Sequence, residues 1–137
     1  MTQREIKFRA WDKVEKEMIE WSELRKLHAS LSYIEESERL DARILMQYTG
    51  LKDRNGKEIY ELDIVRTFYG KIAVVMYLDG SFKLFTNTTD FKPTGTVIGQ
   101  NVEENYLGYF FQENIEIIGN IYQNPELLQD STKGVIV

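Results

Sequence analysis

The chain has 137 residues, of which 42% are apolar and 28% charged, with no cysteine and a formal net charge of −5. This length fits one domain, which we expect over residues 1–130, followed by a tail over 131–137 that is flexible or packs on a neighbouring subunit. The composition excludes a disordered chain and disulfide or thiolate chemistry. The longest apolar run, seven residues at 72–78, is far shorter than the roughly 20 of a membrane helix, so we expect a cytoplasmic protein with no membrane partner.

The N-terminal part of the chain predicts a hairpin followed by a helix or an irregular insertion. Apolar and polar side chains alternate over residues 6–11, which indicates a half-buried strand, and strand character returns at residues 18–21. Apolar side chains then recur every three or four residues, which predicts a helix over residues 23–35 with Ser22 as its candidate N-cap. Glutamates crowd the end of this segment, where the helix dipole disfavours them, so an irregular polar insertion over residues 22–40 stays open.

The rest of the chain predicts short strands joined by tight turns. The expected strands lie at residues 42–48, 59–60, 64–68, 71–78, 81–86, 96–99 and 115–122. Asp53-Arg54-Asn55-Gly56 is the strongest turn signal, because Asn and Gly tolerate the positive φ that hairpin turns require, and Asp79-Gly80 is a second hairpin turn. We therefore assign structural turn roles to Asp53, Asn55, Gly56, Asp79 and Gly80. The pattern predicts a mainly β domain with minor α, whose C-terminal two-thirds form a strongly bent sheet or a small SH3-like barrel.

No pattern of catalytic, cofactor-binding or metal-binding residues survives a check of its spacing. The turn at Asp53 lacks glycine and glutamate at the positions that a calcium loop requires, and no Ser or Thr follows Lys57 as a phosphate-binding loop would need. His28 is the single histidine, which leaves no zinc site of the usual kinds and no serine triad with its elbow motif. Glu61 and Asp63 share one side of an extended segment, with Glu58 nearby, and a turn-capping role for Asp63 is a simpler interpretation than acid/base catalysis. We expect no cofactor, no metal and no catalytic residue.

Charge and aromatic side chains are distributed unevenly along the chain. Residues 1–92 carry equal numbers of basic and acidic side chains, whereas residues 93–132 carry six carboxylates and neither Lys nor Arg. Four aromatic residues fall within residues 106–111. Core packing is the leading interpretation of this segment, a subunit interface the second and base stacking the third. With the apolar C-terminal tail, which could pair with the sheet edge of a neighbouring subunit, it supplies the candidate interface residues Tyr106, Tyr109, Phe110, Phe111, Val135 and Ile136.

Three motifs in this order resemble the YopX family, which is linked to phages and prophages of Gram-positive bacteria. They are IKFRAWD at residues 6–12, LMQYTGLKDRNGKEIYELDIV at 45–65 and IIGNIYQNPELL at 117–128. One departure is Leu62, which stands where the family usually has Gly, and a positive φ there would strain a leucine. The resemblance implies a β-rich, oligomeric protein of unassigned biochemical role, and it carries over no catalytic or binding residue.

The functional hypotheses come from three different classes of protein. The first is a self-associating accessory protein that forms a homo-oligomer and binds a host or phage protein. The alternative is a single-stranded nucleic-acid-binding protein, which the acidic net charge disfavours and which would use a basic patch. That patch would consist of Lys7, Arg9, Lys52, Arg54, Lys57 and Arg66. An enzyme that uses Glu58, Glu61 and Asp63 is the third and least favoured hypothesis.

Overall fold

The computed structural model describes residues 5–30, 42–67, 70–85, 104–106 and 115–128. The chain divides into two compact units, Met1–Gly50 and Leu51–Val137, and each is described here by itself. Strand β3 (Arg43–Lys52) begins in the first unit and ends in the second. The expected single domain over residues 1–130 stays a prediction.

The first unit is built on a central strand that pairs on both sides. Strand β1 (Phe8–Asp12) lies between β2 (Glu17–Ile19) and β3, and both pairings are antiparallel. Ala10 lies opposite both Ile19 and Leu45, so these three side chains leave the sheet on the same face. The alternation that predicted the first strand therefore corresponds to the two faces of a real sheet.

Helix α1 (Trp21–Ser30) packs on the face of Ala10. Ala10, Ile19 and Leu24 form a small buried cluster, and the ring of Trp21 lies 6.2 Å from that of Phe8. The helix begins two residues before the predicted start, and the proposed N-cap at Ser22 is wrong. The carbonyl oxygen of Glu20 accepts the first helical bond, from the Leu24 N–H at 2.8 Å, so Glu20 holds the N-cap position. Residues 31–35 of the predicted helix lie outside the described residues.

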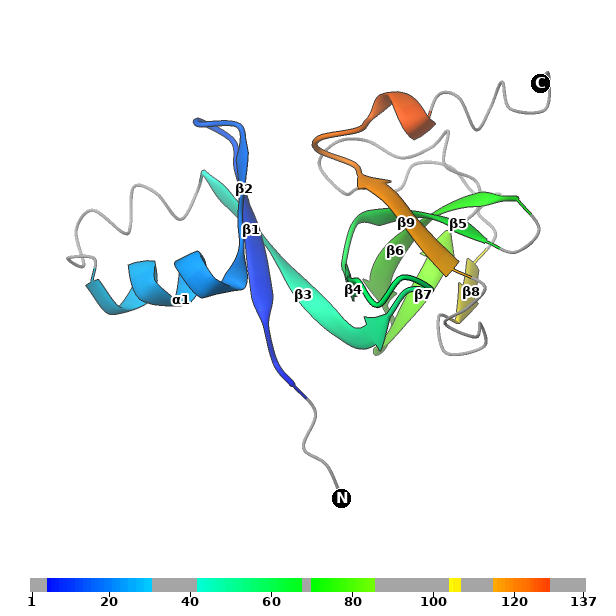
Figure 1. Ribbon diagram of the computed structural model, residues 1–137, viewed down its shortest axis with the longest axis horizontal. Coiled ribbons are helices and arrows are strands. Elements are labelled where there is room, and N and C mark those ends of the chain that lie inside the picture. Colours follow the sequence, from blue (N-terminus) through cyan, green and yellow to red (C-terminus); the bar gives the residue numbers. More distant parts are fainter. Residues whose placement is uncertain (1–4, 31–41, 68–69, 86–103, 107–114, 129–137) are drawn as a thin grey trace. The chain divides into compact units, whose positions relative to one another are not determined.

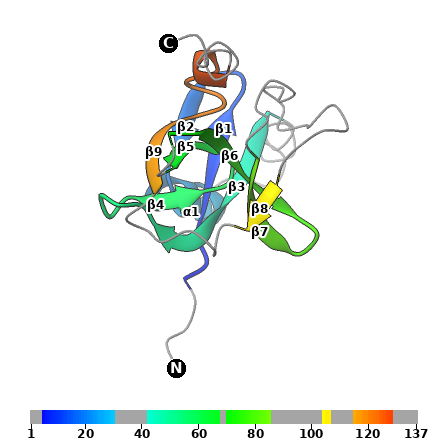
Figure 2. The ribbon, with the colours of Figure 1, turned by 90° about the vertical axis from the view of Figure 1, so that its right-hand side faces the viewer.

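The second unit is organised around an antiparallel sheet with the order β8-β7-β6-β5-β9 (Figures 1 and 2). Its strands are β5 (Asp63–Thr67), β6 (Ile72–Leu78), β7 (Ser81–Phe85), β8 (Glu104–Tyr106) and β9 (Ile115–Asn120). A further short strand, β4 (Glu58–Tyr60), stands next to β3 in the other sheet. The mainly β prediction is confirmed, with one sheet curved into a half-barrel and short helices in the described part. The strand expected at residues 96–99 lies outside the described residues.

The core of the second unit lies on one face of this curved sheet. Its six buried members are Ile59, Val65, Ala73, Val75, Leu84 and Ile115. Leu51, Phe82 and Ile117 pack against them. Ala73 and Val75 alternate along β6 and therefore point to the same face, which also holds Leu84 because it lies opposite Val75. The short strand β4 contributes Ile59, so the turn that precedes β4 is brought to the edge of this core.

Candidate functional site

The turn between β3 and β4 is organised by the buried carboxylate of Asp53. This residue is 4% exposed, and its Oδ1 atom accepts hydrogen bonds from the backbone N–H groups of Asn55 at 2.8 Å and Lys57 at 2.9 Å. The backbone N–H of Asp53 donates to the Lys57 carbonyl, and its carbonyl accepts from the Gly56 N–H. Gly56 has a φ of 80°, which only glycine adopts readily. The local chemistry of Asp, Asn and Gly thus accounts for the shape of this turn.

The same turn is joined to strand β9, far away in the sequence. The second carboxylate oxygen of Asp53, Oδ2, accepts from the Ile117 N–H at 2.9 Å, and the Arg54 N–H donates to the Ile115 carbonyl at 2.9 Å. Ile115 and Ile117 are two residues apart, so their peptide groups point to the same edge of β9. Strand β5 pairs along the other edge. The turn therefore covers the outer edge of β9, which would otherwise offer unpaired backbone groups.

These bonds define what the Asp53 carboxylate can do chemically. Both oxygens accept backbone N–H donors, three in total, and the side chain is almost fully buried. Within the described part of the chain, no group of three His, Cys, Asp or Glu side chains is arranged to hold a metal ion. The carboxylate of Asp53 is thus a structural acceptor that connects a turn to a strand.

A second turn, between β4 and β5, holds a leucine in a glycine-like conformation. Leu62 has a φ of 66° and is 8% exposed. Its N–H donates to the Val75 carbonyl at 2.7 Å, and its carbonyl accepts from the Ile121 N–H at 3.1 Å. The carboxylate of Asp63, 2% exposed, closes the turn by accepting from the Tyr60 N–H at 2.8 Å. The chain thus adopts a positive φ at a leucine, and the buried side chain of Leu62 offsets part of the strain.

The carboxylates near this turn make different interactions. The carboxylate of Asp63 accepts a hydrogen bond from the backbone N–H of Tyr60, whereas the negative charge of Glu61 affects the pKa of the Tyr122 phenol. Burial, and secondly the negative charge of Glu61, raise the pKa of Tyr122 to about 12. The phenol therefore keeps its proton at neutral pH and is neither a base nor a nucleophile there.

The segment after β9 is shaped by side-chain amides. The Asn120 side chain is 6% exposed, and its Oδ1 accepts from the N–H groups of Tyr122 at 3.1 Å and Gln123 at 2.9 Å. Asn124 returns to the strand, because its Oδ1 accepts from the Asn120 N–H at 3.2 Å and its own N–H donates to the Asn120 carbonyl at 2.9 Å. A Cβ atom on Gly119 would come within 3.0 Å of the Asn124 side chain. The third motif therefore specifies a tight turn at this position.

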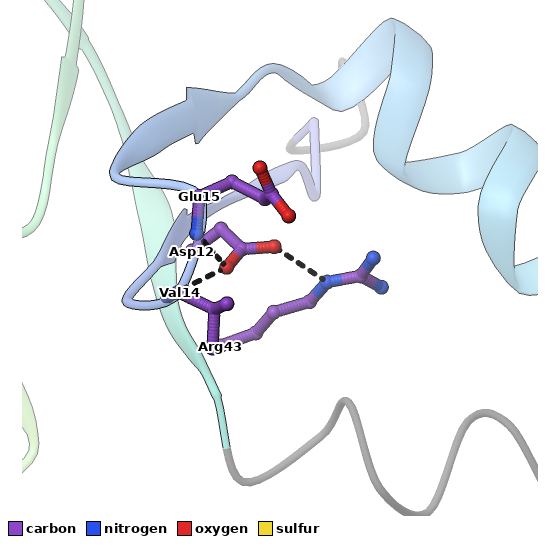
Figure 3. A network of polar contacts seen from close by, with 4 residues as sticks. All are labelled: Asp12, Val14, Glu15 and Arg43. Carbon is purple, nitrogen blue, oxygen red and sulfur yellow. Dashed lines mark hydrogen bonds and ion pairs between the residues drawn. The ribbon is translucent and has the colours of Figure 1, made fainter.

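The first unit uses the same device at the turn between β1 and β2 (Figure 3). Asp12 Oδ1 accepts from the N–H groups of Val14 at 2.9 Å and Glu15 at 3.0 Å, and Asp12 Oδ2 lies 3.8 Å from Arg43 Nε. Lys16, with a φ of 55°, completes the turn by donating its N–H to the Asp12 carbonyl. A carboxylate again satisfies backbone N–H groups of a turn.

The structure corrects the predicted basic patch. Arg9 is 7% exposed, so it cannot contribute to a phosphate-binding surface. Lys7 forms a 2.8 Å ion pair with Glu5, and its Nζ lies 5.5 Å from the centre of the Tyr48 ring. These residues belong to the first unit. The four remaining cations belong to the second unit and are exposed: Lys52, Arg54, Lys57 and Arg66.

The other predicted residues are placed as follows. Asp79 and Gly80 connect β6 to β7 with φ values of 51° and 84°, the two positive values of a tight hairpin turn. Tyr106 ends β8 with its Cα opposite that of Lys83. His28 lies in α1. The remaining interface candidates, Tyr109, Phe110, Phe111, Val135 and Ile136, lie outside the described residues.

Sequence reasoning missed two features of this site. The first is the bond between Asp53 and Ile117, which are 64 positions apart, because no local pattern encodes such a contact. The second is the pair of amides at Asn120 and Asn124. Their four-residue spacing next to a Gly and a Pro was the available signal, since Asn side chains often bond to nearby backbone groups.

Comparisons with known proteins give one matching family and similar solved structures. The family model described as "YopX protein" matches residues 7–129. Among solved structures, the chain is similar to protein EF1440 from Enterococcus faecalis, with a TM-score of 0.56 and 24% identity over 92% of this chain and 99% of that one. It is also similar to protein yopX from Bacillus subtilis, with a TM-score of 0.49 and 21% identity over 89% of this chain and 95% of that one. No curated protein matches the chain.

Proposed function

This chain belongs to the YopX family, and from that premise we propose that it is a phage- or prophage-encoded accessory protein that associates with itself and with another protein. It acts in the cytoplasm of the bacterial host and catalyses no reaction. Among the residues that the structure describes, no helix is long and apolar enough to cross a membrane. The buried carboxylates of Asp53 and Asp63 accept backbone hydrogen bonds, which supports a structural role for these two side chains rather than a catalytic one.

The observation that carries this proposal is an apolar face that is wider than the helix covering it. Leu45 leaves the sheet on the same face as Ala10 but is 53% exposed, whereas Ala10 is fully buried. Ile6, two residues before the half-buried Phe8, is 58% exposed. Exposed apolar side chains that continue a buried cluster favour association with another protein surface. We take the occupant to be a second copy of this chain, in line with the oligomer that the family resemblance implies.

Light scattering at tens of micromolar protein tests self-association directly. We expect a mass above that of the monomer, and a shift towards the monomer in Leu45→Ser. The matched control is Val14→Ser, because Val14 is 72% exposed but lies at the tip of the β1–β2 turn. A monomeric wild-type protein at this concentration would refute the proposal.

A second candidate, binding of single-stranded nucleic acid, is favoured by one observation. Lys52, Arg54 and Lys57 are all exposed around one turn and could contact phosphates. The burial of Arg9 and the net charge of −5 both weaken this candidate. Fluorescence anisotropy with a labelled oligonucleotide at low ionic strength tests it, and an unchanged signal would eliminate it.

A further inference from the structure

The turn between β3 and β4 contains the only Asn-Gly pair in the sequence. Asn55 and Gly56 are both exposed, and a Cβ atom added to Gly56 would have nothing within 4 Å outside its two neighbours in the chain. Every other asparagine is followed by a larger residue, which is Thr, Val, Tyr, Ile or Pro. The backbone nitrogen of Gly56 is therefore the least hindered of all the nitrogens that follow an asparagine.

An unhindered backbone nitrogen in this position can attack the side chain that precedes it. Hydroxide removes the Gly56 N–H proton, and the nitrogen forms a bond to Cγ of Asn55 while the bond from Cγ to the side-chain amide nitrogen breaks and ammonia leaves. Water then adds to one of the two carbonyls of the resulting succinimide ring. The ring opens to aspartate when the bond from Cγ to the Gly56 nitrogen breaks, and to isoaspartate when the bond from the backbone carbonyl carbon to that nitrogen breaks. No electrons are exchanged, and water is the co-reactant.

Two features of the turn act on this reaction in opposite directions. Arg54 and Lys57 are exposed on either side of the pair in the sequence, and their positive charges favour the anion that forms on the Gly56 nitrogen. The hydrogen bonds of the turn oppose the reaction, because the Gly56 N–H donates to the Asp53 carbonyl at 3.0 Å and the Asn55 N–H donates to Asp53 Oδ1 at 2.8 Å. The proton that must leave is thus engaged and the backbone around it is fixed, so the ring closes when the turn opens locally.

We infer that Asn55 is a site of spontaneous deamidation, and that the closed turn around Asp53 limits its rate. Isoaspartate adds a methylene group to the backbone between the N–H groups of Asn55 and Lys57, which both donate to Asp53 Oδ1. The same carboxylate accepts from the Ile117 N–H on β9. The isoaspartate form should therefore hold β9 less well and be less stable than the unmodified protein. This modification is independent of the proposed self-association.

The test is peptide mapping by mass spectrometry of the full chain during incubation at neutral and at mildly alkaline pH. Asn55 should be converted into aspartate and isoaspartate faster than any other asparagine, and faster at the higher pH, because hydroxide removes the Gly56 proton. The matched control within the chain is Asn120, whose side chain is buried and hydrogen-bonded and which is followed by Ile121. The same incubation in guanidinium chloride should speed the loss of the Asn55 amide, since unfolding frees the Gly56 N–H.

A variant separates the charge of the product from its altered backbone. Asn55→Asp carries the new carboxylate on an exposed side chain and should melt close to the wild type when freshly prepared, whereas the incubated protein that contains isoaspartate should melt at a lower temperature. If the Asn55 amide persists as long as that of Asn120, the deamidation site is overturned. Loss of the Asn55 amide that is no faster in the unfolded chain overturns the control by the turn. An equal fall in melting temperature for fresh Asn55→Asp overturns the role given to the isoaspartate backbone.

Discussion

Leu62 offers a direct test of how a buried side chain and a strained backbone oppose each other at one residue. Its φ of 66° lies in the left-handed region, which costs a non-glycine residue about 1–2 kcal/mol. Its side chain is 8% exposed, so Leu62→Ala should destabilise the protein by about 2–5 kcal/mol, as for other buried leucines. Alanine keeps the strain, because it still has a Cβ atom.

Leu62→Gly removes the same side chain and also the strain. The unfolded chain is more flexible with glycine than with alanine at this position, which lowers the free energy of unfolding by about 0.4–1 kcal/mol. Relief of the strain exceeds this cost, so Leu62→Gly should be more stable than Leu62→Ala by roughly 0.5–1 kcal/mol. Both variants should be less stable than the wild type, because the lost burial outweighs the strain.

The control pair is Leu84→Ala and Leu84→Gly. Leu84 is fully buried in β7 and is not among the residues with positive φ. Glycine should therefore be the less stable replacement there, by about 0.5–1 kcal/mol. Urea unfolding of all four variants, followed by circular dichroism, gives the two differences. The reasoning is refuted if glycine is less stable than alanine at Leu62 by as much as at Leu84.

Three further predictions concern the turns and the Tyr122 phenol. Asp53→Asn should lower the free energy of unfolding by about 1–3 kcal/mol, since an amide cannot accept all three N–H donors. Glu15→Gln, at an exposed side chain, should change it by less than about 0.5 kcal/mol in the same urea assay. Gly119→Ala should be destabilising because its Cβ meets the Asn124 side chain, and a double-mutant cycle with Asn124→Ala should show a coupling of at least about 0.5 kcal/mol; additive effects would contradict the clash. The Tyr122 phenol has a pKa of about 12 in the folded protein against 10.0 in the unfolded chain. Its contribution to the stability of the fold is therefore fully present below pH 10 and is lost as the pH rises towards 12. An ultraviolet titration in which every tyrosine ionises near pH 10 would contradict this prediction.

The features that sequence predicts well here depend on short-range chemistry. The turns at Gly56 and Gly80 follow from residues that accept positive φ, and the strands around them from alternating side chains. The predicted start of α1 is wrong, because packing of Trp21 against Phe8, and not the hydroxyl of Ser22, decides where the helix begins. At Leu62 the family resemblance identifies the unusual position, but its conformation depends on bonds to Val75 and Ile121 that come from distant strands.

Arg9 and Lys83 show a second limit of sequence reasoning. Both are charged residues on strands, and a sequence pattern places them on a solvated face. The structure buries them to 7% and 4% exposure, because packing around a strand is decided by elements elsewhere in the chain. The proposed basic patch contained Arg9 for this reason, and the Ile117 N–H on β9 that donates to Asp53 was missed for the same reason.

The bond between Asp53 and Ile117 also has a kinetic consequence. It closes a chain segment of 64 residues, for which the loop-closure entropy is about 3.7 kcal/mol, whereas β6 and β7 are joined by a two-residue turn. The hairpin can therefore form early and the closure of the turn onto β9 late. Interactions that are absent from the folding transition state govern how fast a protein unfolds. The bond between the Asp53 turn and β9 would then determine how fast the second unit unfolds, whereas the rate of folding depends on the strands that this bond brings together.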